Sequence, residues 1–188
     1  MANQFQFTDE ELMARFQSGD ENAYNELVFR YRDRLINFIY RFVNDMEQAE
    51  DIVQDTLTKV FTHRHYYKEI AKVSTWIYTI AGNYAKTELR KRKRRKTIQL
   101  SHIGKGDKVY EIPDLQQEPD IGVHAQFSEQ KIQNALQSLP DHFRSPVILR
   151  DIQELSYEDI SKILDVPLGT VKSRINRARQ QLKSKLKE

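Results

Sequence analysis

The amino-acid sequence predicts an all-α protein in which two small helical domains are joined by a flexible linker, the C-terminal domain containing a helix-turn-helix. Apolar residues recur at helical spacing on both sides of a central segment rich in Gly, Pro and acidic side chains. The 6 Gly and 5 Pro of the chain are too few for a turn-rich β-sandwich or barrel. We therefore expect an N-terminal domain over residues 1–96, a linker over 97–125 and a C-terminal domain over 126–188.

The composition excludes several classes of protein and of site. With 0 Cys, the chain has no disulfide framework, no thiolate metal site and no cysteine nucleophile. No apolar run approaches the ~18 residues that a membrane span needs, and the polar, acidic segment from Met1 to Glu11 does not resemble a secretory signal. We expect a cytoplasmic chain that carries neither a metal nor a cofactor.

Three helices are expected before residue 62. Thr8 and Glu11 have the spacing of a capping box for a short first helix, which ends at Ser18-Gly19-Asp20. Two longer helices follow up to Phe61, separated by a turn at Asn44-Asp45. Their apolar residues form two stripes at helical spacing, namely Ala23, Leu27, Tyr31, Leu35, Phe38, Ile39 and Phe42, and then Ala49, Ile52, Val53, Thr56, Leu57 and Val60.

A fourth, aromatic-rich helix is expected after a loop that spans residues 66–72. Ser74 or Thr75 is its predicted cap, and it should run to about Arg92. Aromatic rings beside cations suit single-stranded nucleic acid, since bases stack on the rings while the cations follow the backbone. The alternative is that the rings are core, which is the better interpretation for Trp76 but fits less well for Tyr67 in the loop.

In the C-terminal half, helical periodicity resumes at Phe127 and continues through Ile132, Ala135, Leu136 and Leu139, and Pro140 starts a further helix. Ser156 then caps a short helix, residues 165–169 break it, and Thr170 could cap a second one. The second helix buries Val171, Ile175, Ala178 and Leu182. This arrangement predicts a helix-turn-helix, whose second helix enters the major groove of DNA.

Polar side chains on the second helix of this motif avoid its apolar face. Lys172, Ser173, Asn176 and Arg177 are candidates for reading base edges, since Arg and Asn can contact guanine and adenine bidentately. Arg174, Arg179 and Lys183 could instead hold phosphates, which fixes register without reading sequence. A helical hairpin with a solvated basic face is the structural alternative.

Charge is strongly segregated along the chain, although the net charge is only +3. Residues 1–60 carry 6 basic and 12 acidic side chains, and residues 107–130 carry one Lys and six acids. Residues 86–96 carry eight basic side chains and one acid, and the last 17 residues carry seven and one. Two basic stripes separated by acidic stretches indicate a polyanion bound at two places. Two solvated helix ends are the alternative interpretation.

Two further groups of polar residues suggest sites at first sight. Asp51, Gln54 and Asp55 share one face of the third helix, which could be an acid–base or metal pair. No catalytic His, phosphate-binding Gly loop or nucleophile motif accompanies them, so an acidic docking surface is the preferred interpretation. His63 and His65 would point apart on a helix, which argues against a metal site.

Four segments combine into a recognisable set, in the order AEDIVQD (49–55), STWIYTIAGN (74–83), LSYEDI (155–160) and GTVKSRINRAR (169–179). Together they resemble bacterial extracytoplasmic-function (ECF) sigma factors, over both domains from about Asp20 to Leu186. The resemblance implies an alternative sigma factor, a subunit that binds core RNA polymerase and directs promoter-specific transcription initiation, and not an enzyme.

The resemblance also implies roles for individual residues. Asp51, Gln54 and Asp55 fall where the family docks on the clamp helices of the largest polymerase subunit, and family members often have Glu at the place of Asp55. The residues implied at the -10 element, which is recognised and melted, are Tyr67, Lys68, Trp76, Asn83, Lys86 and Arg90. Those implied at the -35 element are Thr170, Lys172, Ser173, Arg174, Asn176, Arg177 and Arg179. Further implied partners are promoter DNA, the flap of the second-largest subunit and an anti-sigma factor.

Two other functions are compatible with parts of the sequence. A stand-alone helix-turn-helix regulator would bind duplex DNA without polymerase and would give Asn83 no role. A nuclease using Asp51 and Asp55 would need divalent ions, and phosphoryl chemistry usually requires more converging ligands than this pair supplies.

Overall fold

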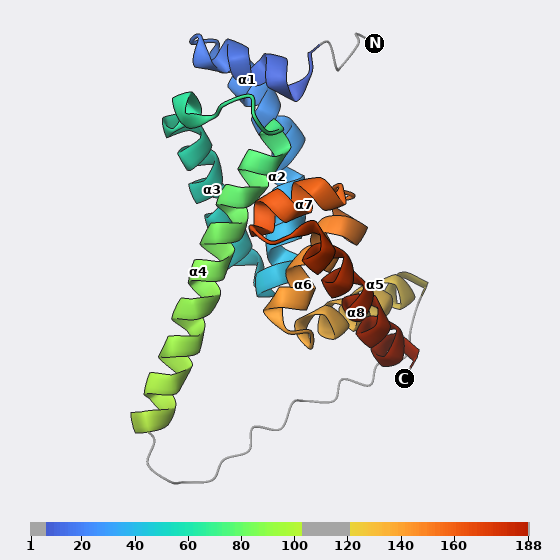
Figure 1. Cartoon of the computed structure of the whole chain (residues 1–188). Helices are drawn as coiled ribbons and strands as arrows, with labels where there is room; N and C mark the ends of the chain where they lie inside the picture. The colour runs from blue at the N-terminus through green and yellow to red at the C-terminus, as the bar shows by residue number, and fades with distance from the viewer. Residues whose placement is uncertain (1–6, 103–120, 188) are drawn as a thin grey trace.

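The computed structural model describes residues 7–102 and 121–187 of this protein, with side chains over 7–95 and 129–187. Throughout the described residues the regular structure is helical, which confirms the predicted all-α class (Figure 1). Helical backbone extends into both ends of the predicted linker, and residues 103–120, the rest of that linker, lie outside the described residues. No helix in the described ranges is long and apolar enough to cross a membrane.

The N-terminal domain consists of α1 (Asp9–Gln17), α2 (Glu21–Val43), α3 (Met46–Thr62) and α4 (Val73–His102). Both capping predictions for the first helices are confirmed. Thr8 Oγ1 accepts a hydrogen bond from the Glu11 amide (3.2 Å), and Glu11 Oε2 accepts one from the Thr8 amide (2.6 Å). The Asp20 carboxylate caps α2. These local contacts fix where α1 and α2 begin.

The predicted turn between α2 and α3 is also confirmed. Asn44 adopts a left-handed conformation (φ 57°) and ends α2, while the Asp45 carboxylate accepts from the Gln48 amide (3.1 Å) and caps α3. The turn is short, so α2 and α3 pack side by side along their length, and α4 lies against both.

The start and end of α4 differ from the prediction. A 3₁₀ helix, η1 (Arg64–Tyr66), and a loop precede it, and α4 begins at Val73, so neither Ser74 nor Thr75 is its cap. It also continues past Arg92 to His102. The basic residues of this stretch are good helix formers, and nothing in their sequence breaks the helix.

The core of the N-terminal domain lies between α2, α3 and α4. Tyr78 of α4 is fully buried and meets the rings of Tyr31 and Phe38 edge-on, at centroid separations of 6.5 and 5.4 Å. The Tyr78 hydroxyl donates to Gln153 Oε1 in the other domain (2.6 Å). Burial raises the pKa of Tyr78 to about 12, so this donor keeps its proton at neutral pH.

The C-terminal domain consists of α5 (Ile121–Gln137), α6 (Asp141–Val147), the π-helical turn η2 (Ile148–Ile152), α7 (Tyr157–Leu164) and α8 (Leu168–Lys187). Pro140 precedes α6, as predicted. Ile132 was expected on the buried stripe of α5 but is 42% exposed, whereas Gln133 is buried. Gln133 is turned inward because its amide bonds to the end of α2, which periodicity cannot indicate.

The helix-turn-helix is formed by α7 and α8. Ser156 Oγ accepts from the Asp159 amide (3.0 Å) and caps α7, and Val171, Ile175 and Ala178 of α8 are buried, both as predicted. The expected cap at Thr170 is wrong, because α8 already begins at Leu168. Thr170 therefore lies in the first turn of the helix.

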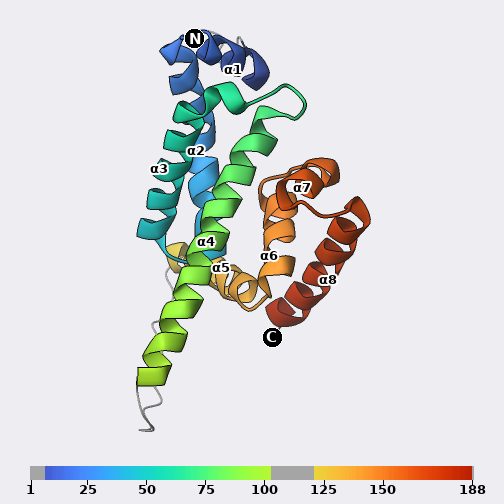
Figure 2. The same ribbon diagram turned by 60° about the vertical axis from the view of Figure 1, so that its left-hand side comes forward.

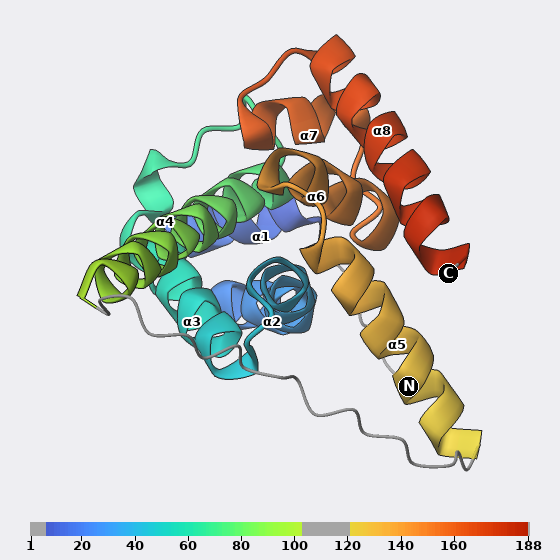
Figure 3. The same ribbon diagram turned by 90° about the horizontal axis from the view of Figure 1, so that it is seen from below.

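The two domains pack directly against each other. Helix α7 lies across α4, and α5 and η2 contact α2 (Figure 2). Figure 3 shows α5 and α6 beside α2, with α7 and α8 on the far side of α6. The C-terminal domain thus covers the end of α2 and one side of α4.

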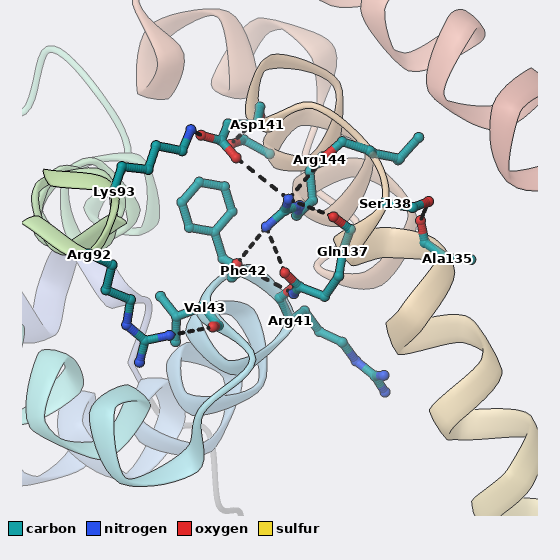
Figure 4. A network of polar contacts seen from close by, with 12 residues as sticks. Arg41, Phe42, Val43, Arg92, Lys93, Ala135, Gln137, Ser138, Asp141 and Arg144 are labelled. Carbon is teal, nitrogen blue, oxygen red and sulfur yellow. Dashed lines mark hydrogen bonds and ion pairs between the residues drawn. The ribbon is translucent and has the colours of Figure 1, made fainter. Parts of the chain in front are cut away.

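Polar side chains from the C-terminal domain bond to the end of α2 (Figure 4). The last carbonyls of a helix have no partner within it. Here the Tyr40 and Arg41 carbonyls accept from Gln133 (3.3 Å) and Gln137 (2.9 Å), and the Phe42 carbonyl accepts from Arg144 (2.9 Å). The Val43 carbonyl accepts from Arg92 of α4 (3.1 Å). We call these contacts the α2 cap.

Candidate nucleic-acid interface

One face of α8 is exposed and basic. Lys172, Ser173, Asn176 and Arg177 are all exposed, on the side of the helix opposite to its buried apolar residues. Ser173 Oγ is engaged locally, donating to the Thr170 carbonyl (3.0 Å). Asn176 and Arg177 have no partner among the described residues, and the Lys172 ammonium lies 6.0 Å from the centroid of the Tyr157 ring. An exposed polar face on the second helix of a helix-turn-helix is the geometry of a groove-reading helix.

Two arginines of the same helix are placed differently. Arg179 bonds to both carboxylate oxygens of Asp151 on η2 (2.5 and 2.9 Å), and this hydrogen bonding raises its pKa. Arg174 is half-buried and faces a cavity against α4. The sequence already distinguished both, as candidate phosphate contacts, from Arg177, and the tertiary structure adds the ion pair of Arg179 and the half-buried position of Arg174.

A hollow of about 400 Å³ lies between the α3–α4 loop, the first turns of α4 and α7. We call it the loop hollow. Its lining residues are Tyr66, Tyr67, Lys68, Ile70, Ala71, Thr75, Trp76, Thr79 and Lys162. Tyr66 and Ile70 leave 77% and 84% of their surface exposed. Exposed apolar and aromatic groups beside Lys68 and Lys162 offer stacking surface and positive charge to a base and its phosphate.

Tyr67 does not present a free ring in this hollow. It is 8% exposed, its hydroxyl donates to the Ala71 carbonyl (2.7 Å), and its ring centroid is 5.5 Å from that of Trp76. The expectation that Tyr67 lies outside the core is therefore wrong, whereas Trp76 packs against the core as expected. Tyr66, at the end of η1, is the more exposed ring of the pair, and one side of it packs against His63 at a centroid separation of 5.4 Å. The sequence could not tell the two tyrosines apart, because adjacent residues outside a regular element have no periodicity.

A polar and basic strip continues from the hollow along α4. Asn83 is exposed, seven residues after Trp76 and so on the same side of the helix. Lys86 is half-buried and Arg90 is exposed. Burial and the neighbouring Arg90 lower the pKa of Lys86, and Asp165 opposes this only in part. The predicted residues of this helix therefore do form one continuous face.

The acidic residues singled out on α3 lie on a different side of the N-terminal domain. Asp51, Gln54 and Asp55 are all exposed, and Gln54 borders a groove between α2 and α3 of about 460 Å³. Among the described residues none of the three has a hydrogen-bonding or ion-pairing partner outside its own helix. Exposed carboxylates beside a partly apolar groove are suited to docking another protein.

Asp159 connects the C-terminal domain to the loop and first turn of α4. This buried carboxylate of α7 accepts from Lys72 Nζ (2.9 Å), Thr75 Oγ1 (3.3 Å) and Ser156 Oγ (2.6 Å). Burial opposes its ionisation, but the hydrogen bonds from Ser156 and Lys72 outweigh burial and lower its pKa. The contact holds α7 over the first turn of α4, so that Lys162 forms one wall of the loop hollow.

The described side chains do not gather into a metal site. Within the described part of the chain, no group of three or more His, Asp or Glu side chains could hold a metal ion. His63 ends α3 and contacts Thr62 through Nδ1 (2.8 Å), and no described acid pairs with it. The charged residues described above form two basic faces, on α4 and α8, and one acidic face, on α3.

Comparison with known proteins matches both halves of the chain to models of one family. Residues 27–95 match Sigma-70 region 2, and residues 129–182 match Sigma-70, region 4. The chain is 33% identical to the RNA polymerase sigma-H factor of Pseudomonas aeruginosa, covering 93% of this chain and 91% of the relative. It is also 33% identical to the ECF RNA polymerase sigma-E factor of Escherichia coli (strain K12), covering 96% and 95%.

Solved structures resemble the chain over both domains at once. The sigma factor RpoE in complex with the anti-sigma factor NepR, from Bartonella quintana, has a TM-score of 0.67 at 29% identity and covers 87% of this chain and 96% of its own. CnrH in complex with the cytosolic domain of CnrY has a TM-score of 0.71 at 20% identity, which shows the shared fold.

Proposed function

The chain belongs to the ECF group of the sigma-70 family, and from this premise we propose how its two domains divide promoter recognition. It is an alternative sigma factor that directs promoter-specific transcription initiation, and its partners are core RNA polymerase, promoter DNA and an anti-sigma factor. Two separate exposed basic faces, one on α4 and one on α8, are the observation that supports these separate roles of the domains. We propose residues 1–96, 97–125 and 126–188 as N-terminal domain, linker and C-terminal domain.

The face of α4 and the loop hollow bind the -10 element in this proposal. Asn83 holds a base that has left the stack, Trp76 supports the hollow, and Lys68, Lys86 and Arg90 follow the backbone. Tyr67 positions the loop from beneath instead of stacking on the base. Unstacking one base costs a few kcal/mol, which hydrogen bonds and backbone cations can offset at one or two positions. The polymerase supplies the remaining free energy of melting.

The exposed face of α8 reads the -35 element. Lys172, Ser173, Asn176 and Arg177 lie nearest the base edges, and Thr170 lies at the start of the helix. Arg174 contacts a phosphate once the domains separate, and Arg179 does so once it is released from Asp151. A bidentate Arg or Asn contact provides about 1–3 kcal/mol of discrimination against a wrong base pair, so a few such contacts suffice to select one element.

The acidic face of α3 docks on the polymerase. Asp51, Gln54 and Asp55 are free to meet the clamp helices of the largest subunit, and the C-terminal domain engages the flap of the second-largest. Since core polymerase is cytoplasmic, we propose the cytoplasm as the place of action. The family consists of DNA-binding regulators, and we assign no catalytic step to this chain.

The packed arrangement of the two domains is the off state. Helix α7 covers the start of α4 and is held there by the Lys72–Asp159 ion pair (2.9 Å), so it lies in the path of a strand that follows α4 from Arg90 toward Trp76. The similar structure from Bartonella quintana is that of a sigma factor bound by an anti-sigma factor. We infer that the domains separate when this chain binds polymerase and promoter, and that an anti-sigma factor favours the packed arrangement.

Run-off transcription tests the function as a whole. Core RNA polymerase on a pool of host promoters is expected to yield discrete new transcripts only when this protein is added. Aligned start sites would then reveal both elements. If no transcript appears while the protein alone binds duplex DNA tightly, the stand-alone regulator is the correct function.

Arg177→Ala is expected to relax sequence preference at one -35 position. Loss of a base-edge contact removes about 1–3 kcal/mol of discrimination there, roughly 5- to 150-fold. Transcription from promoters mutated singly across the -35 element measures the change. Lys183→Ala is the control, since a phosphate contact should weaken all promoters equally. A uniform loss with Arg177→Ala would make Arg177 a phosphate contact as well.

A further inference from the structure

A second cavity, of about 250 Å³, lies between the two domains. Helix α4 provides one side through Lys86, Leu89 and Arg90, and α6, α7 and α8 provide the other, including Leu164 and Arg174. Cations therefore face one another across an interface that forms only when the domains are packed together. We call this the interdomain cavity.

The charge in this cavity is unbalanced. Four cationic side chains line it, Lys86, Arg90, Lys93 and Arg174, against the single carboxylate of Asp141. That carboxylate is already bonded to Lys93 (2.9 Å) and contacts Arg144 (3.5 Å). Among the described residues, Lys86, Arg90 and Arg174 take part in no ion pair. Among the lining residues, four cations and one acid give a formal charge of +3, and Asp165 close by opposes part of it.

The environment of Lys86 also indicates an excess of positive charge in the cavity. This ammonium is half-buried and makes no hydrogen bond within the described residues. Burial and Arg90 lower its pKa, and the carboxylate that opposes them, Asp165, has a smaller effect. Like charges held close together in a partly desolvated space destabilise the packed arrangement unless an anion neutralises them.

The size and walls of the cavity limit which anion fits. A DNA duplex, whose major groove alone is about 12 Å wide, cannot enter a space of about 250 Å³. Two guanidinium groups, those of Arg90 and Arg174, favour phosphate oxygens, which they can bind as a fork. A charge of +3 favours several phosphates over one. Leu89, Pro146 and Leu164 leave an apolar wall beside the cations.

We propose that the interdomain cavity binds a small molecule with two or three phosphate groups, held by Lys86 and Arg90 of the N-terminal domain and Arg174 of the C-terminal domain. Because its walls come from both domains, the ligand binds only the packed arrangement and shifts the protein toward it. The proposal rests on the off state described above. The same cations are assigned to promoter DNA, so ligand and promoter exclude each other.

Titration of the full-length protein with inorganic tripolyphosphate tests the site in the absence of DNA and polymerase. At constant ionic strength we expect saturable 1:1 binding by calorimetry and a rise in the thermal unfolding midpoint. Arg174→Gln and Lys86→Gln should each weaken binding about tenfold or more. Arg177→Gln is the matched control, one turn along α8 and exposed, and should change affinity less than about twofold. Circular dichroism establishes that each variant is folded.

Two further measurements identify the ligand source and the coupling to domain packing. If ATP binds more tightly than tripolyphosphate, the apolar wall of the cavity contacts a nucleoside. If the two bind with equal affinity, the ligand of the site is a free oligophosphate. Since the chain has no Cys, labels at Asn25→Cys and Lys185→Cys can report the interdomain distance, which tripolyphosphate should hold at its short value.

Three outcomes would overturn the proposal. They are absence of saturable binding, equal losses in Arg174→Gln and Arg177→Gln, and binding during which the interdomain distance becomes longer than in the packed arrangement. None of them affects the run-off experiment, so failure of this site and failure of the sigma-factor function are distinguishable.

Discussion

Replacing Arg144 by Ala is expected to lower the free energy of unfolding by about 2–4 kcal/mol and to let the two domains separate. The guanidinium is 7% exposed and donates to the carbonyls of Phe42 (2.9 Å), Gln137 (3.0 Å) and Leu139 (2.9 Å). It also donates to the Gln137 side chain (2.8 Å). Alanine removes all four bonds and leaves the Phe42 carbonyl only the long contact from the Gln137 amide (3.5 Å). Hydrogen bonds to charged groups contribute about 1.5–3 kcal/mol each.

The Phe42 bond makes this change more than a local one. Arg144 is the cation that the C-terminal domain contributes to the α2 cap, and the carbonyl that it bonds belongs to the other domain. Thermal unfolding should therefore show a midpoint lower by roughly 5–10 °C, and small-angle scattering should show a larger radius of gyration at temperatures where the helices are intact.

Arg150→Ala is the matched control for this prediction. Arg150 also donates to a backbone carbonyl, that of Leu155 (2.8 Å), but within its own domain. The Arg150→Ala substitution should lower the free energy of unfolding without changing the radius of gyration. An unchanged radius in Arg144→Ala would show that the α2 cap does not hold the domains together.

Replacing Asn83 by Ala is expected to reduce open-complex formation roughly 5- to 150-fold while polymerase binding stays nearly intact. The side chain is exposed on α4, in line with the loop hollow, where we propose that it holds an extruded base. Alanine leaves polar atoms of that base unpaired in a partly desolvated site, at a cost of about 1–3 kcal/mol. Permanganate reactivity of thymines in the -10 element measures melting directly.

Polymerase affinity and a second asparagine provide the controls for this experiment. Asn25→Ala makes the same chemical change at an exposed position on α2, and should leave melting unchanged. The wild-type protein, Asn83→Ala and Asn25→Ala should form holoenzyme with core polymerase equally well, because Asn83 lies apart from the acidic face of α3. Unchanged melting in Asn83→Ala would remove this residue from the proposed base site.

Features that depend on neighbours in the sequence were predicted well. The capping box at Thr8, the αL turn at Asn44 and the Ser156 cap each rest on contacts between residues at most a few positions apart. The exposed face of α8 follows from helical periodicity, which places Asn176 and Arg177 away from the buried face of Val171, Ile175 and Ala178. The sequence by itself therefore determined the helices, the helix-turn-helix and the two basic faces.

Only the tertiary structure decided which polar side chains turn inward. Gln133, Gln137 and Arg144 bond carbonyls of α2 that are 93 to 102 positions away. Periodicity predicts such polar residues to be exposed, since it contains no information on what another domain brings beside them. Tyr67 was misjudged for the same reason, because Trp76 and the Ala71 carbonyl cover it only once α4 packs against the loop. The carbonyls at the end of α2 and the ring of Tyr67 are covered by other segments of the chain. Those segments reach them only when α4 packs against its loop and the two domains pack together.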